Sequence, residues 1–105
     1  MLPRNQRLQF LQIQRDRASL FEPDAVIDCG GGRFLHGHEA IRSYYADVTA
    51  SGRKFAVGEQ RAALVSSDLA LTSTRFPDGD VTSEVAGRQT DGSWLWVIDR
   101  YSVDW

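Results

Sequence analysis

The chain has 105 residues, of which 42% are apolar and 25% charged, and its formal net charge is −2. These proportions exclude a disordered or membrane chain, and the net charge provides no basic surface for binding nucleic acid. No apolar run is long enough to span a bilayer, residues 1–7 lack the apolar segment of a secretory signal, and the lone Cys29 can form no internal disulfide. We therefore expect one cytoplasmic domain over residues 1–105 that binds neither nucleic acid nor membrane.

Two segments predict helices. Residues 5–21 are good helix formers with apolar residues at helical spacing, and Pro23 is expected to end or kink this first helix. Residues 38–50 give a clearer pattern, in which apolar and aromatic residues recur every three or four positions. These residues are Ile41, Tyr44, Tyr45 and Val48. Gly52 follows at the place of a helix C-cap.

The rest of the chain has strand character interrupted by turn residues. Residues 25–29 and 33–36 predict a short hairpin across three consecutive glycines. Further strands are expected over residues 54–65, 69–76, 81–89 and 94–103. Because short polar segments connect them, consecutive strands are expected to be antiparallel neighbours in a meander. Helices followed by a meander indicate an α+β fold.

The last two strands meet at Asp91-Gly92, which favours a two-residue hairpin turn. This turn sets the register of the hairpin. The predicted pairs are Arg88 with Leu95, Ala86 with Val97, Glu84 with Asp99 and Thr82 with Tyr101. On this register Glu84, Arg88 and Asp99 share one face, and charges on an otherwise apolar face suggest a lined cavity.

Several short motifs follow one another in a specific order. They are residues 21–26, His36-Gly37-His38-Glu39-Ala40-Ile41-Arg42, residues 68–71, and Asp91-Gly92-Ser93-Trp94 with Ile98-Asp99. Together they resemble the SnoaL-like proteins of the nuclear transport factor two superfamily, over about residues 20–103. The resemblance implies a conical α+β barrel, in which N-terminal helices pack in a bent antiparallel meander sheet around a pocket. That family includes ketosteroid isomerases, polyketide cyclases, epoxide hydrolases, dehydratases and binding domains, so the fold does not name an activity.

The resemblance assigns one face of the final hairpin to the pocket. That face carries Glu84, Arg88, Val97, Asp99 and Tyr101. Further lining residues are expected to be Phe21, Ile27, Cys29, His36 and Tyr45. The opposite face, which carries Trp94, Trp96, Ile98 and Val85, is expected to form a homodimer interface, as commonly happens in the family. Alternation alone leaves the reverse open, with the tryptophans in the pocket and the charges outside.

The facing carboxyl groups suggest two kinds of chemistry. In a partly dry cavity Glu84 and Asp99 repel each other, so that one could stay protonated and donate a hydrogen bond to an oxyanion. Arg88 beside them would instead keep both charged, either as a structural ion-pair network or in a way similar to the acid-arginine-acid arrangement of epoxide hydrolases. The resemblance puts Cys29 at the position of the isomerase base. Asp28, one residue away and on the other face, stays open as a general base.

No metal or cofactor is expected. His36 and His38 could form a metal pair, but no third ligand stands at a recognisable spacing. Two functions remain. One is a cofactor-independent isomerase, cyclase or hydrolase that uses Glu84, Asp99, Arg88 or Asp28. The other is a module without turnover, which binds a small, largely apolar molecule with one polar end or serves in dimerisation.

Overall fold

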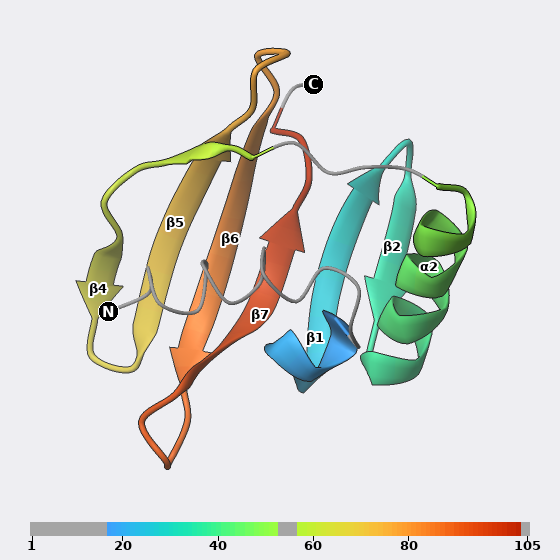
Figure 1. Ribbon diagram of the computed structural model, residues 1–105. Coiled ribbons are helices and arrows are strands. Elements are labelled where there is room, and N and C mark those ends of the chain that lie inside the picture. The colour runs from blue at the N-terminus through green and yellow to red at the C-terminus, as the bar shows by residue number, and fades with distance from the viewer. Residues whose placement is uncertain (1–16, 53–56, 104–105) are drawn as a thin grey trace.

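A computed structural model describes residues 17–52 and 57–103 (Figure 1). These residues form a 3-10 helix η1 (Arg17–Leu20), an α-helix α2 (His38–Ala50) and a curved sheet of seven strands, which together are an α+β fold. The strands are β1 (Phe21–Gly30), β2 (Arg33–His36), β3 (Glu59–Gln60), β4 (Leu64–Ser66), β5 (Leu69–Arg75), β6 (Val81–Arg88) and β7 (Trp94–Arg100).

The sheet is mixed. Its strand order is β2-β1-β7-β6-β5-β3, and β4 pairs with β5 beside β3. Strand β1 runs parallel to β7, whereas the other strand pairs are antiparallel. The expectation of a purely antiparallel meander is therefore wrong at one place, where the first strand of the described chain joins the last and enters the middle of the sheet (Figure 1).

The first expected helix ends earlier than its pattern predicts. Its residues 5–16 lie outside the described residues, residues 17–20 form η1, and Phe21 already begins β1. Pro23 consequently lies inside a strand instead of ending a helix. The β1–β7 register shifts between Phe21 and Val26, and such an irregularity accommodates a proline because proline has no N–H to donate.

Other boundaries follow local chemistry closely. Helix α2 has the expected bounds and buries Ile41, Tyr45 and Val48. The expected strand over residues 54–65 is instead two short strands, β3 and β4, and its residues 54–56 lie outside the described residues. The triple glycine makes the predicted turn, because Gly31 and Gly32 both have positive φ in the β1–β2 hairpin.

The core lies on one face of the sheet, which we call the inner face. A row of directly paired residues crosses it from β5 to β1, and all four are at most 3% exposed. The row consists of Ala70, Ala86, Trp96 and Phe21. The remaining face, which carries Leu71, Val85, Ile98 and Val26, is the outer face.

The β6–β7 hairpin corrects the predicted register. Arg88 pairs with Trp94 and Ala86 with Trp96, because residues 89–93 form a longer loop than the expected two-residue turn. A bulge between the Ala86–Trp96 and Val85–Ile98 pairs then leaves Val97 as an extra residue. Trp94 and Trp96 are consequently buried in the core, and their assignment to a dimer interface is wrong.

Candidate functional site

A second row on the inner face carries the acid pair. It runs from Thr72 on β5 through Glu84 on β6 and Asp99 on β7 to Ile27 on β1. The predicted pairing of Glu84 with Asp99 is confirmed. The two residues are only 6% and 8% exposed, so two ionisable groups lie side by side within the folded domain.

Threonine hydroxyls surround the Glu84 carboxylate. Thr72 Oγ1 and Thr74 Oγ1 donate to Glu84 Oε1 over 3.0 and 3.2 Å, and Thr82 Oγ1 donates to Oε2 over 2.7 Å. Hydroxyl donors favour the ionised form of a buried carboxyl group and hold its plane in one orientation. We call Glu84, Asp99 and these three threonines the acid cluster.

The next row of the inner face ends in two polar groups that have no partner among the described residues. Gln60 pairs with Thr74, Thr74 pairs with Thr82, and Tyr101 follows one residue after the Ser83–Arg100 pair. The amide nitrogen of Gln60 and the hydroxyl of Tyr101 are both buried, yet neither makes a hydrogen bond to another described residue. Each such group costs about 1–3 kcal/mol, so two of them beside an acid cluster call for a physical reason.

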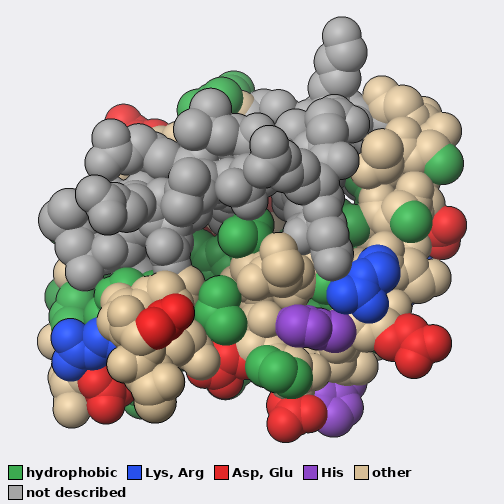
Figure 2. Space-filling model, turned by 60° about the horizontal axis from the view of Figure 1, so that its bottom comes forward, with side chains coloured by type: hydrophobic (Ala, Val, Ile, Leu, Met, Phe, Trp, Pro, Cys, Tyr) green, Lys and Arg blue, Asp and Glu red, His purple; other side chains and the backbone are tan. Residues whose placement is uncertain are grey.

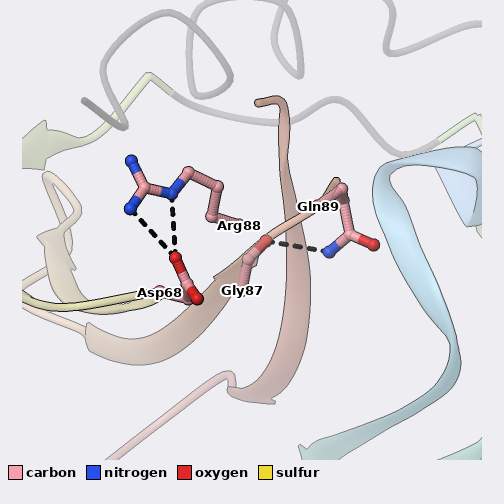
Figure 3. Close-up of polar contacts among 4 residues, drawn as sticks. All are labelled: Asp68, Gly87, Arg88 and Gln89. Atoms are coloured by element: carbon pink, nitrogen blue, oxygen red, sulfur yellow. Dashed lines mark hydrogen bonds and ion pairs between the residues drawn. The ribbon is translucent and has the colours of Figure 1, made fainter. Parts of the chain in front are cut away.

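Arg88 does not belong to the acid cluster. Its Nε and a terminal nitrogen lie 3.0 and 2.9 Å from Asp68 Oδ1, and its backbone N–H donates to the Asp68 carbonyl. Figure 3 shows Arg88 turned toward Asp68, while Gln89 points to the other side of the strand and donates to the Gly87 carbonyl. The expectation that Arg88 sits beside Glu84 and Asp99 is therefore wrong, because the longer loop places it at the exposed end of β6.

Three other expected site residues lie on the outer face. Asp28 accepts hydrogen bonds from Arg100 Nε and from the Gly30 backbone, both over 2.9 Å. His36 is exposed and pairs with Val26. The bulge turns Val97 outward, since a Cβ built on Gly87 would meet a Val97 methyl group at 3.1 Å. The side chains of these residues thus point away from the inner face, although Asp28 and Asp99 both line a hollow of about 400 Å³.

The remaining expected residues lie on the inner side or at its edge. Phe21, Ile27 and Tyr45 are buried in the core cluster, and Tyr101 and Cys29 pack against that cluster. Trp94 and Trp96 add to the same apolar surroundings. The structure therefore brings Glu84, Asp99 and Tyr101 together with apolar walls, and leaves out Arg88, Asp28, His36 and Val97.

Cys29 lies at a separate hollow of about 410 Å³ beside α2. Arg33, Tyr44 and Asp47 also line this hollow, and the Arg33 guanidinium carbon stands 5.1 Å from the Tyr44 ring centroid. Burial raises the pKa of the Cys29 thiol, against the opposing effects of Arg33 and of a hydrogen bond with Tyr44. A raised pKa gives less thiolate at neutral pH, which disfavours Cys29 as a nucleophile.

The two histidines lie in different surroundings. His38 Nε2 lies 2.6 Å from the Phe21 carbonyl oxygen, which secures the start of α2 to β1. Figure 2 shows histidine surface (purple) near acidic side chains. Within the described ranges, however, no three His, Cys, Asp or Glu residues are grouped so that they could hold a metal ion.

The threonines and Gln60 are site residues that the sequence reasoning missed. Strand β5 reads Leu-Ala-Leu-Thr-Ser-Thr-Arg, and hydrophobicity alone would turn its leucines inward. The structure does the opposite, because Ala70, Thr72 and Thr74 are buried while Leu69 and Leu71 are exposed. The usable signal is the run of three hydroxyl residues, Thr72, Ser73 and Thr74, on the strand next to the one that carries Glu84.

Comparison with known proteins identifies the fold. No protein-family model and no curated protein matches the chain. Among solved structures, a protein of the NTF2-like (nuclear transport factor 2-like) family from Streptomyces avermitilis, provisionally named a dehydratase, is 17% identical. It aligns with a TM-score of 0.72 over 94% of this chain and 90% of its own. A cystatin-like domain of unknown function from Nostoc punctiforme is 18% identical, with a TM-score of 0.75 over 99% of this chain and 75% of its own.

A third structure carries the name of an enzyme class. It is a protein from Parabacteroides distasonis, provisionally named a ketosteroid isomerase, which is 18% identical and has a TM-score of 0.60 over 79% of this chain and 69% of its own. Identities this low establish the fold and leave the activity to the site itself. The chain thus has the NTF2-like, cystatin-like fold. In the part of the chain that the structure describes, no helix is long and apolar enough to cross a membrane.

Proposed function

We propose that the inner face binds a small, uncharged molecule that is largely apolar and carries an oxygen able to accept hydrogen bonds. The observation that carries this proposal is a pair of buried polar groups, on Gln60 and Tyr101, for which residues 17–52 and 57–103 supply no hydrogen-bond partner. Each can donate a hydrogen bond, so a carbonyl, hydroxyl or ether oxygen of a ligand would satisfy either one. Because they stand at opposite ends of a row across four strands, one oxygen does not reach both. Buried donors without partners lower the stability of the ligand-free protein. A ligand that accepts their hydrogen bonds restores that stability.

The surroundings favour a neutral ligand. Glu84 and Asp99 lie in the neighbouring row of the same face, and their negative charge disfavours a carboxylate or phosphate there. The adjoining row of the inner face is apolar, because it consists of Ala70, Ala86, Trp96 and Phe21, so the proposed site lies against the hydrophobic core. A SnoaL-like protein in a cytoplasmic setting remains our expectation for the broader class.

The proposal is tested by ligand capture and by two tyrosine variants. Native mass spectrometry of the gently purified chain would reveal a retained neutral molecule. Thermal-shift screening would then compare cyclic ketones and alcohols with carboxylates of the same carbon skeleton. We expect the ketones or alcohols to raise the melting temperature of the wild type and of Tyr44→Phe, but not that of Tyr101→Phe. A preference for the carboxylates, or equal shifts in Tyr101→Phe, would contradict the proposal.

A second candidate function is acid–base catalysis on such a ligand. It is favoured by the direct pairing of two buried carboxyl groups, since one can hold a proton while the other is ionised. Glu84 accepts three hydroxyl hydrogen bonds, so Asp99 is the member that we expect to exchange the proton. Asp99→Asn would then abolish turnover of a captured molecule while retaining its binding. Unchanged turnover in this variant would exclude the pair from catalysis and leave a binding module.

A further inference from the structure

Two neighbouring rows on the outer face of the sheet differ in chemical character. The apolar row crosses β1, β7 and β6 through the directly paired residues Val26, Ile98 and Val85. The polar row lies two positions further along each of these strands, and its directly paired residues are Asp28, Arg100 and Ser83. Because residues two apart on a strand point to the same face, the two rows lie side by side, about 7 Å apart.

The hollow of about 400 Å³ on this face is lined by all six residues of the two rows, and we call it the outer hollow. Phe34, which pairs with Asp28, extends its lining to β2 and is 64% exposed. Val103 adds another apolar wall and is 43% exposed. Sites for small molecules have volumes of about 300–1,000 Å³ and combine apolar walls with a few polar groups. The outer hollow has both properties.

The polar row presents hydrogen-bond donors and acceptors next to each other. Arg100 Nε donates to Asp28 Oδ2 and the Gly30 backbone N–H donates to Asp28 Oδ1, both over 2.9 Å. Among the described residues, Asp28 is the side chain that binds the Arg100 guanidinium, and this bond leaves the terminal N–H groups of Arg100 available. A carboxylate has about four acceptor positions, so Asp28 can accept further hydrogen bonds as well.

The charges at the outer hollow favour a neutral head group. A carboxylate would bind Arg100 but lie against the Asp28 carboxylate, and Asp99, which also lines the hollow, adds a second negative charge. An ammonium group would bind Asp28 but lie against the Arg100 guanidinium, whose side chain is the more exposed of the two, at 59% against 22%. A primary carboxamide avoids both conflicts, because its carbonyl oxygen accepts hydrogen bonds while its NH₂ group donates them.

We propose that the outer hollow binds a small primary carboxamide that carries an apolar ring or chain. The carbonyl oxygen accepts a hydrogen bond from a terminal nitrogen of Arg100, and the NH₂ group donates to Asp28. The apolar part packs on the neighbouring row and on the exposed ring of Phe34. This ligand lies on the opposite face of the sheet from the acid cluster, so the proposal is independent of the function proposed for the inner face.

Titration of the full chain followed by protein NMR tests the proposal, with benzamide as the probe. Benzoate and benzylamine are the matched controls, since they keep the ring and replace only the head group. We expect benzamide to bind at least about tenfold more tightly than either control, because each control places a like charge beside Asp28 or Arg100. Its addition should shift the backbone signals of Val26, Phe34 and Ile98, which line the outer hollow.

Two variants separate the head group from the apolar wall. Arg100→Met removes the donors and Phe34→Ala removes the exposed ring, so each should weaken benzamide binding at least about fivefold. The matched control is Arg75→Met, since Arg75 forms its ion pair with Glu59 on exposed surface and does not line the hollow. This control should bind benzamide as the wild type does. Circular dichroism establishes that each variant is folded, and Phe34→Ala retains the test if Arg100→Met does not fold.

Four results would overturn the proposal. The first is a wild type that does not bind benzamide at millimolar concentration, and the second is equal or tighter binding of benzoate or benzylamine. The third is binding that folded Arg100→Met and Phe34→Ala retain while Tyr101→Phe loses it, because the molecule would then lie on the inner face. The fourth is a shift of the same backbone signals when the protein alone is diluted, because a second copy of the chain would then cover the hollow.

Discussion

Replacing Thr72 with valine tests whether the acid cluster is held as the structure describes. Thr72 is 2% exposed, and its hydroxyl donates to Glu84 Oε1 over 3.0 Å. Valine keeps the shape of the side chain but puts a methyl group against the carboxylate oxygen. A hydrogen bond to a charged group contributes about 1.5–3 kcal/mol. Because Thr74 still donates to the same oxygen, we expect the free energy of unfolding to fall by about 2 kcal/mol.

Chemical and thermal denaturation measure this loss. For a domain of this size, about 2 kcal/mol corresponds to a fall in melting temperature of roughly 8–16 °C. The matched control is Ser73→Ala, which removes a hydroxyl from the adjacent residue on the other face of the same strand. We expect that control to change stability by less than about 0.5 kcal/mol. If Thr72→Val were no less stable than Ser73→Ala, the threonine hydroxyls would not hold a buried carboxylate, and our reasoning would fail.

Three further predictions follow from individual contacts. Gly58→Ala should destabilise the protein by about 1–3 kcal/mol in urea denaturation, since its new Cβ would overlap the methyl group of Thr74, a member of the acid cluster. An unchanged midpoint would contradict this packing. Because burial raises the pKa of Cys29, the folded chain keeps a proton that the unfolded chain loses. Stability should therefore fall as pH rises above the ordinary thiol value of 9.0, and less steeply in Cys29→Ser; equal slopes from pH 8 to pH 10 would exclude the shift. Hydrogen bonds from the Ser93 hydroxyl and backbone lower the pKa of Asp91, so its contribution is present above pH 3.8 and is lost on further acidification. Asp91→Ala should then lower the melting temperature more at pH 7 than at pH 2.

Local patterns predicted the parts of the fold that local chemistry decides. The three- and four-residue spacing of Ile41, Tyr45 and Val48 gave the bounds of α2 and its buried face. The glycines at 31 and 32 have the positive φ values that their turn requires. The parallel pairing of β1 with β7 was not predictable in this way, because it joins segments about 70 residues apart. The hydrophobic pattern of neither segment indicates which strand it pairs with.

The acid pair was predicted correctly although the register around it was not. The loop after Arg88 is longer than a two-residue turn, which moves Trp94 and Trp96 one position and turns them inward. The bulge at Val97 then restores the expected alignment, so that Glu84 still faces Asp99. A single extra residue moves the side chains that follow it to the other face of the sheet, and the hydrophobic pattern of the strand does not reveal it. This is why the tryptophans were placed on the wrong side.

The stability of Tyr101→Phe is the most direct test that the inner face retains polar groups for a ligand. The Tyr101 hydroxyl is buried and has no hydrogen-bond partner among the described residues. Removing it should therefore leave the free energy of unfolding of the ligand-free protein unchanged or raise it, by up to about 1–3 kcal/mol. A loss of more than about 1 kcal/mol in urea denaturation would mean that the hydroxyl is already satisfied within the folded chain. The reason for expecting a ligand oxygen beside Glu84 and Asp99 would then be gone.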